Sequence, residues 1–431
     1  MENTTNKPIL IVVGGQYGSE SKGLVAGHLA VERDVDICVR TGSINAGHTV
    51  YYKGKPYVNQ LIPVGWVNLK TKLVLGAGVY IESELLAKEV KMINEAIGDG
   101  SDVRDRLLID VRCGVHNESH HKTEQDMDLH GTMGSTGKGV AAAIVDKMMR
   151  QPEYKLFSQT QEATGYAMVD TVRMLNNAYK VGMLILIEGT QGALLDFHLG
   201  HYPYVTSRQT QAGAWLLEAG LPSNYKTEIY SVIRTYPIRV AGNSGPMGKR
   251  EIRWSDLARS INTKLKHVGK EPLIDELVLF QFDEAELEVL DEAGLSGYGH
   301  PCDWSKELRK EHSKFLSEFP SMTLKRLSDE YTITELRKLF EITTVTKKLR
   351  RIAELDFDEL DYSVIINNPN FLVVNFLNYE FPSCWGVKTV RDLMACSEWP
   401  DIINYLKEIE LRTGAKIKYV NCSPDCIIPT I

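Results

Sequence analysis

Short runs of apolar residues recur along the chain, separated by longer stretches in which apolar residues return every three or four positions. The runs predict buried strands at 9–13, 37–39, 73–75, 107–109, 183–187, 229–233, 371–376 and 417–419. Helical periodicity lies between several of them, at 82–97, 140–150 and 399–413. Strands that alternate with helices favour an α/β fold with a largely parallel central sheet flanked by helices. Ligands of such sheets bind at the carboxyl ends of the strands.

One stretch departs from this pattern. Residues from about 250 to 340 are charged and rich in Glu, Leu and Lys, and their periodicity predicts helices that break at 297–301. None of the motifs described below falls here, and we expect a helical elaboration of the fold. The length of 431 residues is by itself sufficient for two or three domains.

Composition narrows the class of function. The chain has 56 acidic against 49 basic residues and a net charge of −7, whereas a protein that grips a nucleic-acid backbone usually shows a basic excess. A free nucleotide is therefore favoured over DNA or RNA as the ligand. The seven cysteines form no CxxC pair, which predicts reduced thiols and a cytoplasmic location. The polar N-terminus and the lack of a long apolar run predict neither a secretory signal nor a membrane span.

The first apolar run ends in a glycine-rich stretch, Val12-Val13-Gly14-Gly15-Gln16-Tyr17-Gly18-Ser19-Glu20-Ser21-Lys22-Gly23, after which a helical pattern begins. Strand, loop and helix in this order predict a phosphate cradle. Small residues let backbone N–H groups approach phosphate oxygens, and Lys22 and the helix N-terminus add positive potential. The loop is not a Walker A motif, because Ser21 replaces a glycine and Gly23 stands where a magnesium-binding Ser or Thr is needed. Since a glycine-rich strand end is also a common structural turn, further motifs must decide.

Further motifs follow in a fixed order. They are Asn45-Ala46-Gly47-His48-Thr49, Gly134-Ser135-Thr136-Gly137-Lys138-Gly139, Glu188-Gly189-Thr190-Gln191-Gly192-Ala193-Leu194-Leu195-Asp196, Tyr202-Pro203-Tyr204-Val205-Thr206-Ser207 and Thr343-Thr344-Val345-Thr346-Lys347-Lys348-Leu349-Arg350-Arg351. With the phosphate loop, this set resembles the adenylosuccinate synthetase family over residues from about 9 to 430. The resemblance implies one large domain, residues 1–431, with subdomains, related in fold to P-loop NTPases. It also implies a homodimeric, Mg²⁺-dependent ligase that joins aspartate to a purine nucleotide.

The resemblance places phosphoryl transfer beside the phosphate loop. The family moves a γ-phosphate onto the 6-oxygen of the base, after which the aspartate amine displaces phosphate. Positioning and donors to the developing charge matter most in such a step. His48 would hydrogen-bond the oxygen that changes hands, although a histidine after a glycine is otherwise often a turn residue. The expected catalytic residues are Ser19, Lys22 and His48, and the expected magnesium contacts are Ser19 and the Gly47 carbonyl.

The same resemblance assigns the three substrates. The substrate nucleotide would contact Asn45, Thr136, Arg150, Gln191, Leu195, Thr206, Arg239 and Val240. Aspartate would contact Thr344, Val345, Thr346, Lys348 and Arg350, since hydroxyls and guanidinium groups suit a dicarboxylate. ATP would contact Gln16, Gly18, Glu20, Ser21, Lys22, Gly23, Asn375, Asn378, Ser423 and Pro424. Arg150 matches an arginine that the neighbouring subunit donates, and its alternative is a solvated charge at a helix end.

One departure from the family pattern concerns the substrate. The ordinary enzyme carries an aspartate where this chain has Ser19, and that carboxylate takes the N1 proton of hypoxanthine. A serine hydroxyl, whose pKa lies far above neutral, cannot be that base unaided. Guanine has an extra 2-amino group beside N1. The shorter, neutral side chain of Ser19 leaves room for this group and can accept a hydrogen bond from it.

A second departure concerns the phosphate donor. Where the family has Thr-Lys-Leu-Asp, whose aspartate pairs with guanine, this chain has Asn375-Phe376-Leu377-Asn378. An asparagine amide can pair with adenine, and Phe376 can stack where the lysine stem lay. Both departures together resemble the phage-encoded branch of the family, which joins aspartate to dGMP on the route to 2-aminoadenine in DNA, with ATP or dATP as donor. Ser21 and the segment at 250–340 depart from that branch.

Alternatives remain open at this stage. The chain can be an adenylosuccinate synthetase that acts on IMP or another purine nucleotide, or an inactive nucleotide-binding relative, which the loss of the aspartate base permits. Retention of His48, Lys22 and the aspartate loop argues against inactivity. A separate question is raised by His116 and His120, whose spacing of four can place two metal ligands on one helix face. Their polar surroundings are equally typical of a solvated loop or helix.

Overall fold

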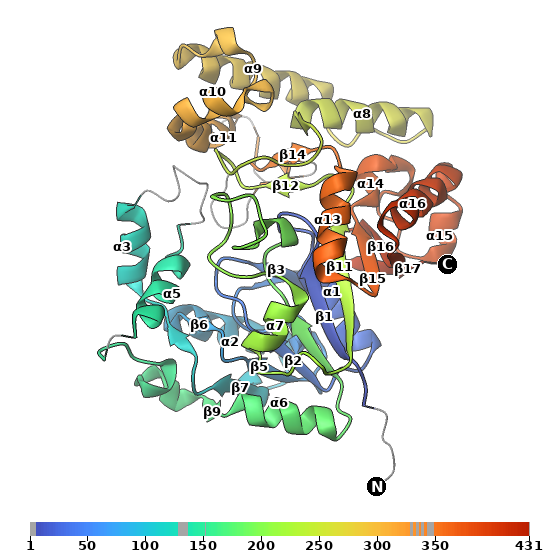
Figure 1. Ribbon diagram of the computed structural model, residues 1–431. Coiled ribbons are helices and arrows are strands. Elements are labelled where there is room, and N and C mark those ends of the chain that lie inside the picture. The colour runs from blue at the N-terminus through green and yellow to red at the C-terminus, as the bar shows by residue number, and fades with distance from the viewer. Residues whose placement is uncertain are drawn as a thin grey trace.

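The computed structural model of the chain describes residues 6–127, 137–150, 152–327, 331–332, 336–337, 340–342 and 349–430. A ten-stranded sheet runs through it in the order β17-β16-β15-β11-β1-β10-β2-β5-β7-β9 (Figure 1). All its neighbours pair in parallel except β16 and β17, which are antiparallel. The strands are β1 (Ile9–Gly14), β2 (Ile37–Arg40), β5 (Lys72–Leu75), β7 (Leu107–Asp110), β9 (Ala167–Val169), β10 (Ile185–Glu188), β11 (Thr227–Arg234), β15 (Phe371–Asn375), β16 (Lys416–Ser423) and β17 (Cys426–Pro429). The predicted α/β fold with a largely parallel sheet is confirmed.

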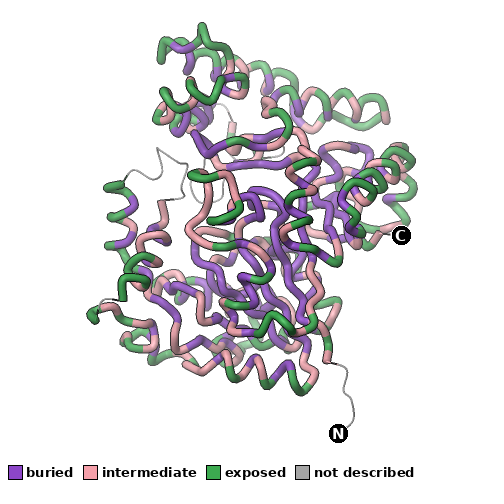
Figure 2. The backbone as a smooth tube through the Cα atoms, viewed as in Figure 1, coloured by how far each residue is buried: buried purple, intermediate pink, exposed green. Residues whose placement is uncertain are grey.

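Helices cover both faces of the sheet. Alternate residues of a strand point to opposite faces, so one strand contributes apolar side chains to two cores. In β1, Leu10 and Val12 join one core while Ile9, Ile11 and Val13 join the other. Figure 2 shows the resulting buried centre. The first core includes α1 (Lys22–Glu32) and α2 (Ser83–Ile97), the second α6 (Thr171–Lys180) and α7 (Ala212–Glu218), and a third packs α13 (Phe357–Asn367) and α16 (Trp399–Thr413) on β15 and β16.

Smaller elements surround the main sheet. The antiparallel hairpin of β3 (His48–Tyr52) and β4 (Lys55–Asn59) carries the histidine of the Asn-Ala-Gly-His-Thr motif at its start. Short parallel strands β6 (Tyr80–Ile81) and β8 (Gly114–Val115) lead into α2 and α3 (Glu118–Asp126), and α5 (Val140–Met149) packs on α3. Near the end of the chain lie α14 (Leu377–Glu380) and α15 (Val390–Met394).

The charged stretch forms a separate helical layer at the top of Figure 1. Its helices are α8 (Trp254–His267), α9 (Glu276–Glu292), α10 (Lys306–Glu311) and α11 (Ser313–Leu327). Helices α8, α9 and α11 share a core with a three-stranded antiparallel sheet of β12 (Ile238–Arg239), β14 (Arg351–Ala353) and β13 (Glu251–Ile252), through residues such as Trp254, Phe282 and Ile352. The helical layer is therefore attached to the strand that follows the predicted aspartate loop. Within the described part of the chain, no helix is both long and apolar enough to cross a bilayer.

Candidate active site

Polar residues end four central strands on the same edge of the sheet. Arg40 at the end of β2 is paired in register with Glu188 at the end of β10. Arg234 at the end of β11 is likewise paired with Asn375 at the end of β15. All four are buried, so each needs a polar partner. Between these two pairs, β1 ends at Gly14, where the phosphate loop begins, and the carboxyl edge thus collects the predicted site as expected for a parallel sheet.

The phosphate loop folds around the carboxylate of Glu20. One oxygen of Glu20 accepts hydrogen bonds from the backbone N–H groups of Gln16 at 3.2 Å and Gly18 at 2.7 Å. The other accepts one from Lys22 Nζ at 2.6 Å, and both charged side chains are buried. These N–H groups and this ammonium are the donors that the sequence predicts for phosphate. A carboxylate of the chain itself therefore holds the cradle in shape, and an incoming phosphate has to share its donors.

The serines of the loop adopt a backbone conformation that favours glycine. Ser19 has φ 63° and Ser21, which caps α1, has φ 69° and ψ 37°. An L-residue in this left-handed region costs about 1 kcal/mol. Ser21 thus keeps the glycine-like turn that the motif needs, although it is not glycine. Gly23 is required for a different reason, since a Cβ there would lie 2.7 Å from the Cβ of His48. Helix α1 therefore begins directly against the catalytic histidine candidate.

His48 is held by a buried carboxylate and a buried guanidinium. Its Nδ1 lies 2.5 Å from Glu188 Oε1 and 3.0 Å from Nη1 of Arg40, which also donates to Glu188. The second oxygen of Glu188 accepts the Val64 N–H at 2.8 Å. Burial and the neighbouring Arg40 charge lower the pKa of His48 to about 4, so that the ring is neutral at neutral pH.

The far side of the same ring is available for chemistry. Nε2 of His48 is buried and has no hydrogen-bond partner among the described residues. With Glu188 accepting from Nδ1, the imidazole has a fixed orientation and Nε2 is the nitrogen left for a ligand. A phosphate beside Nε2 favours protonation of the ring, because the anion and Glu188 then lie on opposite sides of one cation. His48 can therefore change from acceptor to donor as negative charge approaches.

A second polar cluster surrounds Ser19. Arg350 donates from Nη1 to the Ser19 hydroxyl, and Arg234 donates from Nη1 to the Ser19 carbonyl at 3.0 Å. Glu341 accepts from Arg234 at 2.6 Å and from the Tyr379 hydroxyl at 3.2 Å. The Arg350 N–H donates to the Glu341 carbonyl at 2.9 Å. Among the contacts of the described residues, Arg350 uses one lone pair of the Ser19 hydroxyl, whose proton and second lone pair can serve a substrate.

The predicted base and sugar contacts lie next to the loop. An added Cβ at Gly18 would lie 3.9 Å from the Gln191 backbone and from the Leu195 side chain, so both residues adjoin the phosphate loop. The Leu195 carbonyl accepts the Thr206 N–H at 2.8 Å, which brings a predicted phosphate contact to the same place. Gln191 itself has φ 62°, a strained conformation that is common at functional sites.

Arg239 is more deeply embedded than a ligand-facing arginine needs to be. It donates to the carbonyls of Pro246 at 2.6 Å and Tyr204 at 2.8 Å, and its guanidinium lies 4.6 Å from the Tyr17 ring centroid. Burial lowers its pKa to about 9. The adjacent Val240 is half-buried, and its carbonyl accepts from Ser244. In this structure Arg239 joins the segment at 236–246 to the loop at 202–206.

The predicted donor-base contacts lie on the other side of the loop. Nδ2 of Asn375 donates to the Glu20 carbonyl at 2.6 Å, while its buried Oδ1 has no partner among the described residues. The Phe376 ring packs 3.7 Å from the Arg234 guanidinium, a cation–π contact. Asn378 is buried on α14, and Ser423, whose hydroxyl donates to Asp425 at 2.9 Å, precedes the exposed Pro424.

Several predicted residues lie at the margin of the site or outside the described part of the chain. Thr136, Thr344, Val345, Thr346 and Lys348 lie outside the described residues. Asn45 is half-buried before the exposed Gly47. A serine hydroxyl at 19 and a carbonyl at 47 are oxygen donors, and together with phosphate oxygens and waters they fit Mg²⁺, which takes few protein ligands. Arg150 ends α5 as an exposed residue with φ 53°.

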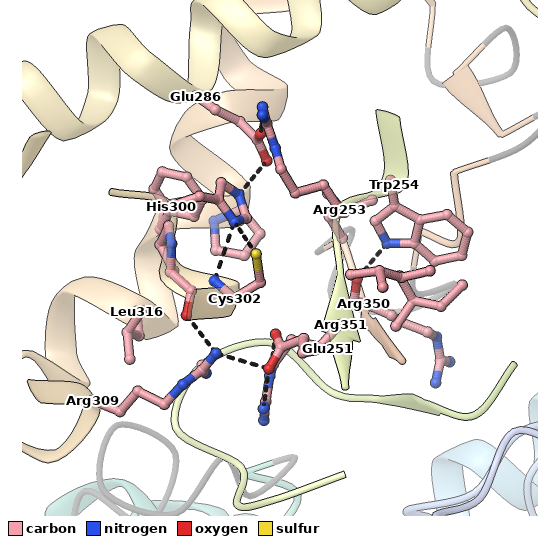
Figure 3. A pocket seen from close by; sticks show the side chains of 17 residues that line it. Glu251, Arg253, Trp254, Glu286, His300, Cys302, Arg309, Leu316, Arg350 and Arg351 are labelled. Carbon is pink, nitrogen blue, oxygen red and sulfur yellow. Dashed lines mark hydrogen bonds and ion pairs between the residues drawn. The ribbon is translucent and has the colours of Figure 1, made fainter. Parts of the chain in front are cut away.

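A cavity of about 60 Å³ lies beneath the helical layer (Figure 3). Glu251 binds Arg351 through two hydrogen bonds, at 2.9 and 2.6 Å, and accepts another from Arg309 of α10 at 2.8 Å. Trp254 of α8 donates to the Arg350 carbonyl at 2.6 Å. The helical elaboration thus holds the two arginines that end the predicted aspartate loop at 343–351, a role that its sequence did not indicate.

The sequence analysis missed the residues that hold the ligand-facing groups. Arg40 and Glu188 orient His48, and Arg234 and Glu341 fix Ser19 and Phe376. Three of these four residues have one detectable signal, because Arg40, Glu188 and Arg234 each end an apolar run. Glu341 has no such signal, since its contact depends on how a distant segment returns to the loop.

Comparisons with known proteins agree with this geometry. A family model described as adenylosuccinate synthetase matches residues 11–157 and 151–272. The adenylosuccinate synthetase of Methanococcus aeolicus is 38% identical and that of Pyrococcus horikoshii 27% identical; the alignments cover 96% and 97% of this chain and 96% of each relative. The structure of the cyanophage S-2L succinoaminodeoxyadenylate synthetase (PurZ) bound to dGMP and dATP superposes with a TM-score of 0.68 at 23% identity, covering 99% of this chain and 96% of that one. The fully ligated adenylosuccinate synthetase of Plasmodium falciparum gives a TM-score of 0.65 at 18% identity, covering 99% and 100%.

Proposed function

This chain belongs to the adenylosuccinate synthetase family of nucleotide-dependent carbon–nitrogen ligases, and we propose that within it the chain joins L-aspartate to dGMP. The donor is ATP or dATP, and the products are N6-succino-2-amino-2′-deoxyadenylate, ADP or dADP, and phosphate. Such a reaction is a step toward 2-aminoadenine in DNA and uses metabolites of the cytoplasm, that of the host cell if the chain is phage-encoded. The proposal rests on the side chain at position 19 and its surroundings.

Ser19 carries the substrate assignment. A carboxylate at this position faces N1 of hypoxanthine in the ordinary enzyme, whereas here the group is neutral and short. Arg350 donates to the Ser19 hydroxyl and Arg234 to its carbonyl, so the side chain has a fixed place and a free lone pair. A 2-amino group beside N1 is a donor that this lone pair can accept. The base of dGMP carries this 2-amino group, and the base of IMP does not.

The donor assignment rests on the segment 375–378. An aspartate that pairs with guanine is replaced by Asn378, and the buried Oδ1 of Asn375 is an acceptor without a partner among the described residues. Adenine carries a 6-amino donor where guanine carries a carbonyl. An unused acceptor near the donor site therefore favours ATP or dATP over GTP.

The chain's own residues then supply positioning and charge stabilisation. The γ-phosphoryl group passes to the 6-oxygen of the base, N1 loses its proton, and the aspartate amine forms the new C–N bond as phosphate departs with that oxygen. Lys22 and the loop N–H groups bind the phosphates, and His48, backed by Glu188, donates from Nε2 to the oxygen that changes hands. Mg²⁺ would neutralise phosphate charge and would be held by the Gly47 carbonyl; Ser19 would contact it only where the remaining lone pair of its hydroxyl is not taken by the 2-amino group. Arg350 beside Ser19 lowers the energy of the base after it has lost the N1 proton.

A homodimer is part of the proposal. Helix α5 ends in the exposed Arg150, and Val145, Met148 and Met149 beside it are exposed by 54%, 70% and 61%. Exposed apolar side chains next to a charged residue are typical of an interaction surface. A partner subunit seated on this surface would receive Arg150 at its own 5′-phosphate site.

The second candidate is an adenylosuccinate synthetase that acts on IMP. The archaeal relatives named for that activity cover nearly the whole chain, and one of them is 38% identical. A single experiment separates the candidates: purified protein with aspartate, Mg²⁺ and either ATP or GTP is given dGMP, GMP or IMP, and succinylated products are identified by mass spectrometry. Turnover of dGMP supports the proposal, turnover of IMP alone supports the second candidate, and no product with any donor supports an inactive relative.

The proposal that Arg150 reaches the 5′-phosphate site of a partner subunit has its own test. Arg150→Ala should weaken dGMP binding, and mixing it with His48→Ala should restore part of the activity, because one hybrid site then has both residues intact. Lys180→Ala, which alters an exposed helix-end charge away from α5, is the control. Lack of recovery in a mixture that demonstrably exchanges subunits would show that each site is built from one chain.

A further inference from the structure

Three metal-ligating side chains meet away from the proposed active site. Glu82 precedes α2, His116 follows β8, and His121 lies in the first turns of α3. One ligand atom from each lies within 4.8 Å of the other two. His116 Nδ1 is 3.6 Å and His121 Nε2 is 3.8 Å from the same oxygen of Glu82. These separations are too long for hydrogen bonds.

His116 is oriented as a metal ligand is. Its Nε2 donates to the Lys138 carbonyl at 2.6 Å, and since a carbonyl only accepts, this nitrogen carries the proton. In the neutral ring Nδ1 is then a bare lone pair. Nδ1 is buried, has no hydrogen-bond partner among the described residues and is turned toward the Glu82 carboxylate. A histidine that donates one N–H to a backbone carbonyl and offers the other nitrogen is the usual arrangement at a metal.

Two lone-pair donors that face each other without a proton between them repel, and a cation between them removes that repulsion. Ligand atoms around a tetrahedral zinc lie about 3.4 Å apart when the metal–ligand distances are about 2.1 Å. The separations from Glu82 of 3.6 and 3.8 Å need only a small contraction. Glu82 and His121 are each about 30% exposed, which leaves a path for an ion and a water ligand.

We propose that Glu82, His116 and His121 form a binding site for a divalent transition metal, with Zn²⁺ the best match to two imidazoles and one carboxylate. The pair that spacing alone suggested, His116 with His120, is not the one that the fold assembles. His116 lies before α3 rather than on it, and Nε2 of His120 is 3.0 Å from Asp146. Chain geometry instead selects His121 and adds Glu82, which is distant in sequence.

The site joins segments that are far apart in the sequence. It links the start of α2 to the start of α3 and, through the Lys138 carbonyl, to the residue pair that precedes α5. Glu124 of α3 already accepts the Gly139 and Ala141 N–H groups at the start of α5, both at 2.8 Å. A bound ion would therefore fasten α3 and α5 to the edge of the main fold, which is a structural role.

The test uses the full-length protein after removal of metals with a chelator. Titration with Co²⁺ should give the visible absorption of a tetrahedral site, Zn²⁺ should displace it at one ion per chain, and the thermal midpoint should rise with Zn²⁺. His121→Ala and Glu82→Gln, both at partly exposed positions, should weaken Zn²⁺ binding at least tenfold. His116→Ala should do the same, but it alters a buried residue and its folding must be checked by circular dichroism.

Two control variants test whether Zn²⁺ binds at Glu82, His116 and His121 rather than elsewhere. His267→Ala removes an exposed histidine on α8, and Cys302→Ser removes the thiol beside His300, another histidine with a potential ligand next to it. Both should bind Zn²⁺ like the unaltered chain. The proposal is overturned if the unaltered chain shows no saturable binding, or if the folded Glu82→Gln, His121→Ala double variant binds as tightly as the unaltered chain.

Discussion

The two sides of the proposed active site hold their polar groups in different ways. On one side, His48 is fixed by Arg40 and Glu188, which end adjacent strands paired in register. On the other, Ser19 is fixed by Arg234 of β11 and by Arg350, which precedes β14 in the small sheet under the helical layer. The first side depends mainly on the central sheet, and the second also on the small sheet that carries the helical layer.

This difference indicates that the two sides serve different functions, phosphoryl transfer and selection of the base. A group that serves the phosphoryl transfer common to the family must be rigid, and the ends of a parallel sheet supply rigidity through the strand ladder itself. Groups that select the base need to vary, and side chains on loops held by other loops vary without disturbing the sheet. We therefore expect changes on the His48 side to lower turnover with any substrate, and changes on the Ser19 side to alter which substrate is used.

The largest effect is expected for His48→Ala. Removal of a donor to the transferring oxygen should lower kcat by roughly 100-fold or more while nucleotide binding changes little. The ratio of rates with dGMP and IMP should stay the same, since this side does not read the base. Steady-state kinetics and calorimetric binding measure both. His267→Ala is the matched control. An unchanged kcat in His48→Ala would show that His48 is only a turn residue.

Ser19→Asp tests the other side. A longer, charged group beside the 2-position should disfavour dGMP and admit IMP, and it introduces a carboxylate that can take the N1 proton. One well-placed polar contact is worth about 1–3 kcal/mol, so the dGMP-to-IMP ratio of kcat/KM should shift about ten- to a hundredfold. Competition assays with both nucleotides report this ratio directly. A constant ratio contradicts the substrate assignment, and Ser19→Thr, which keeps the hydroxyl, should change it least.

Asn378→Asp addresses the phosphate donor. A carboxylate pairs with the N1–H and N2–H groups of guanine, so the preference for ATP over GTP should fall by about tenfold. The shift is expected to be incomplete, because Phe376 remains packed on Arg234. Rates with the two donors at fixed dGMP provide the measurement. Equal preferences in the variant and the unaltered chain would mean that the donor base is recognised elsewhere.

The lowered pKa of His48, which is buried beside Arg40 and Glu188, should also make the stability of the fold depend on pH. The unfolded chain binds a proton on His48 below about pH 6.5, whereas the folded chain does so only near pH 4. The free energy of unfolding is therefore retained in full above pH 6.5 and falls as the pH drops toward 4, by about 1–3 kcal/mol. Urea unfolding at pH 7.5 and 5 measures this loss. His48→Asn should lose less stability over that range, and an equal loss in both proteins would assign it to other groups.

Ser21→Gly should have the smallest effect. The serine has φ 69°, a conformation that glycine adopts freely, so the substitution should stabilise the fold by up to about 1 kcal/mol and leave the loop path unchanged. Ser305→Gly, at a helix cap with φ −62°, should instead destabilise it slightly. Thermal unfolding compares the two. Loss of turnover in Ser21→Gly would show that the hydroxyl, and not only the backbone, serves the site.

Much of the molecule is readable from the sequence because local patterns carry it. Every predicted strand is present with its ends shifted by two residues or fewer, except that the strand predicted at 417–419 continues to Ser423, and the helix predicted at 399–413 has those bounds. Apolar alternation and runs report burial on a pleated surface, and strand-loop-helix order places the phosphate loop at the carboxyl edge. The ordered motifs likewise identify His48, Ser19 and Gln191, since each is tied to a short, distinctive string.

Partnerships between distant segments depended on tertiary structure alone. No local pattern pairs Ser19 with Arg350, Glu188 with His48, or Glu82 with His121, because side-chain contacts depend on how strands are ordered and how loops return, and sequence separation says nothing about either. The sequence by itself determined the sheet and the phosphate loop, and it predicted which motif residues face the ligands. Only the folded chain decided what holds those residues in place, since a buried charge takes whichever partner the packing brings within reach.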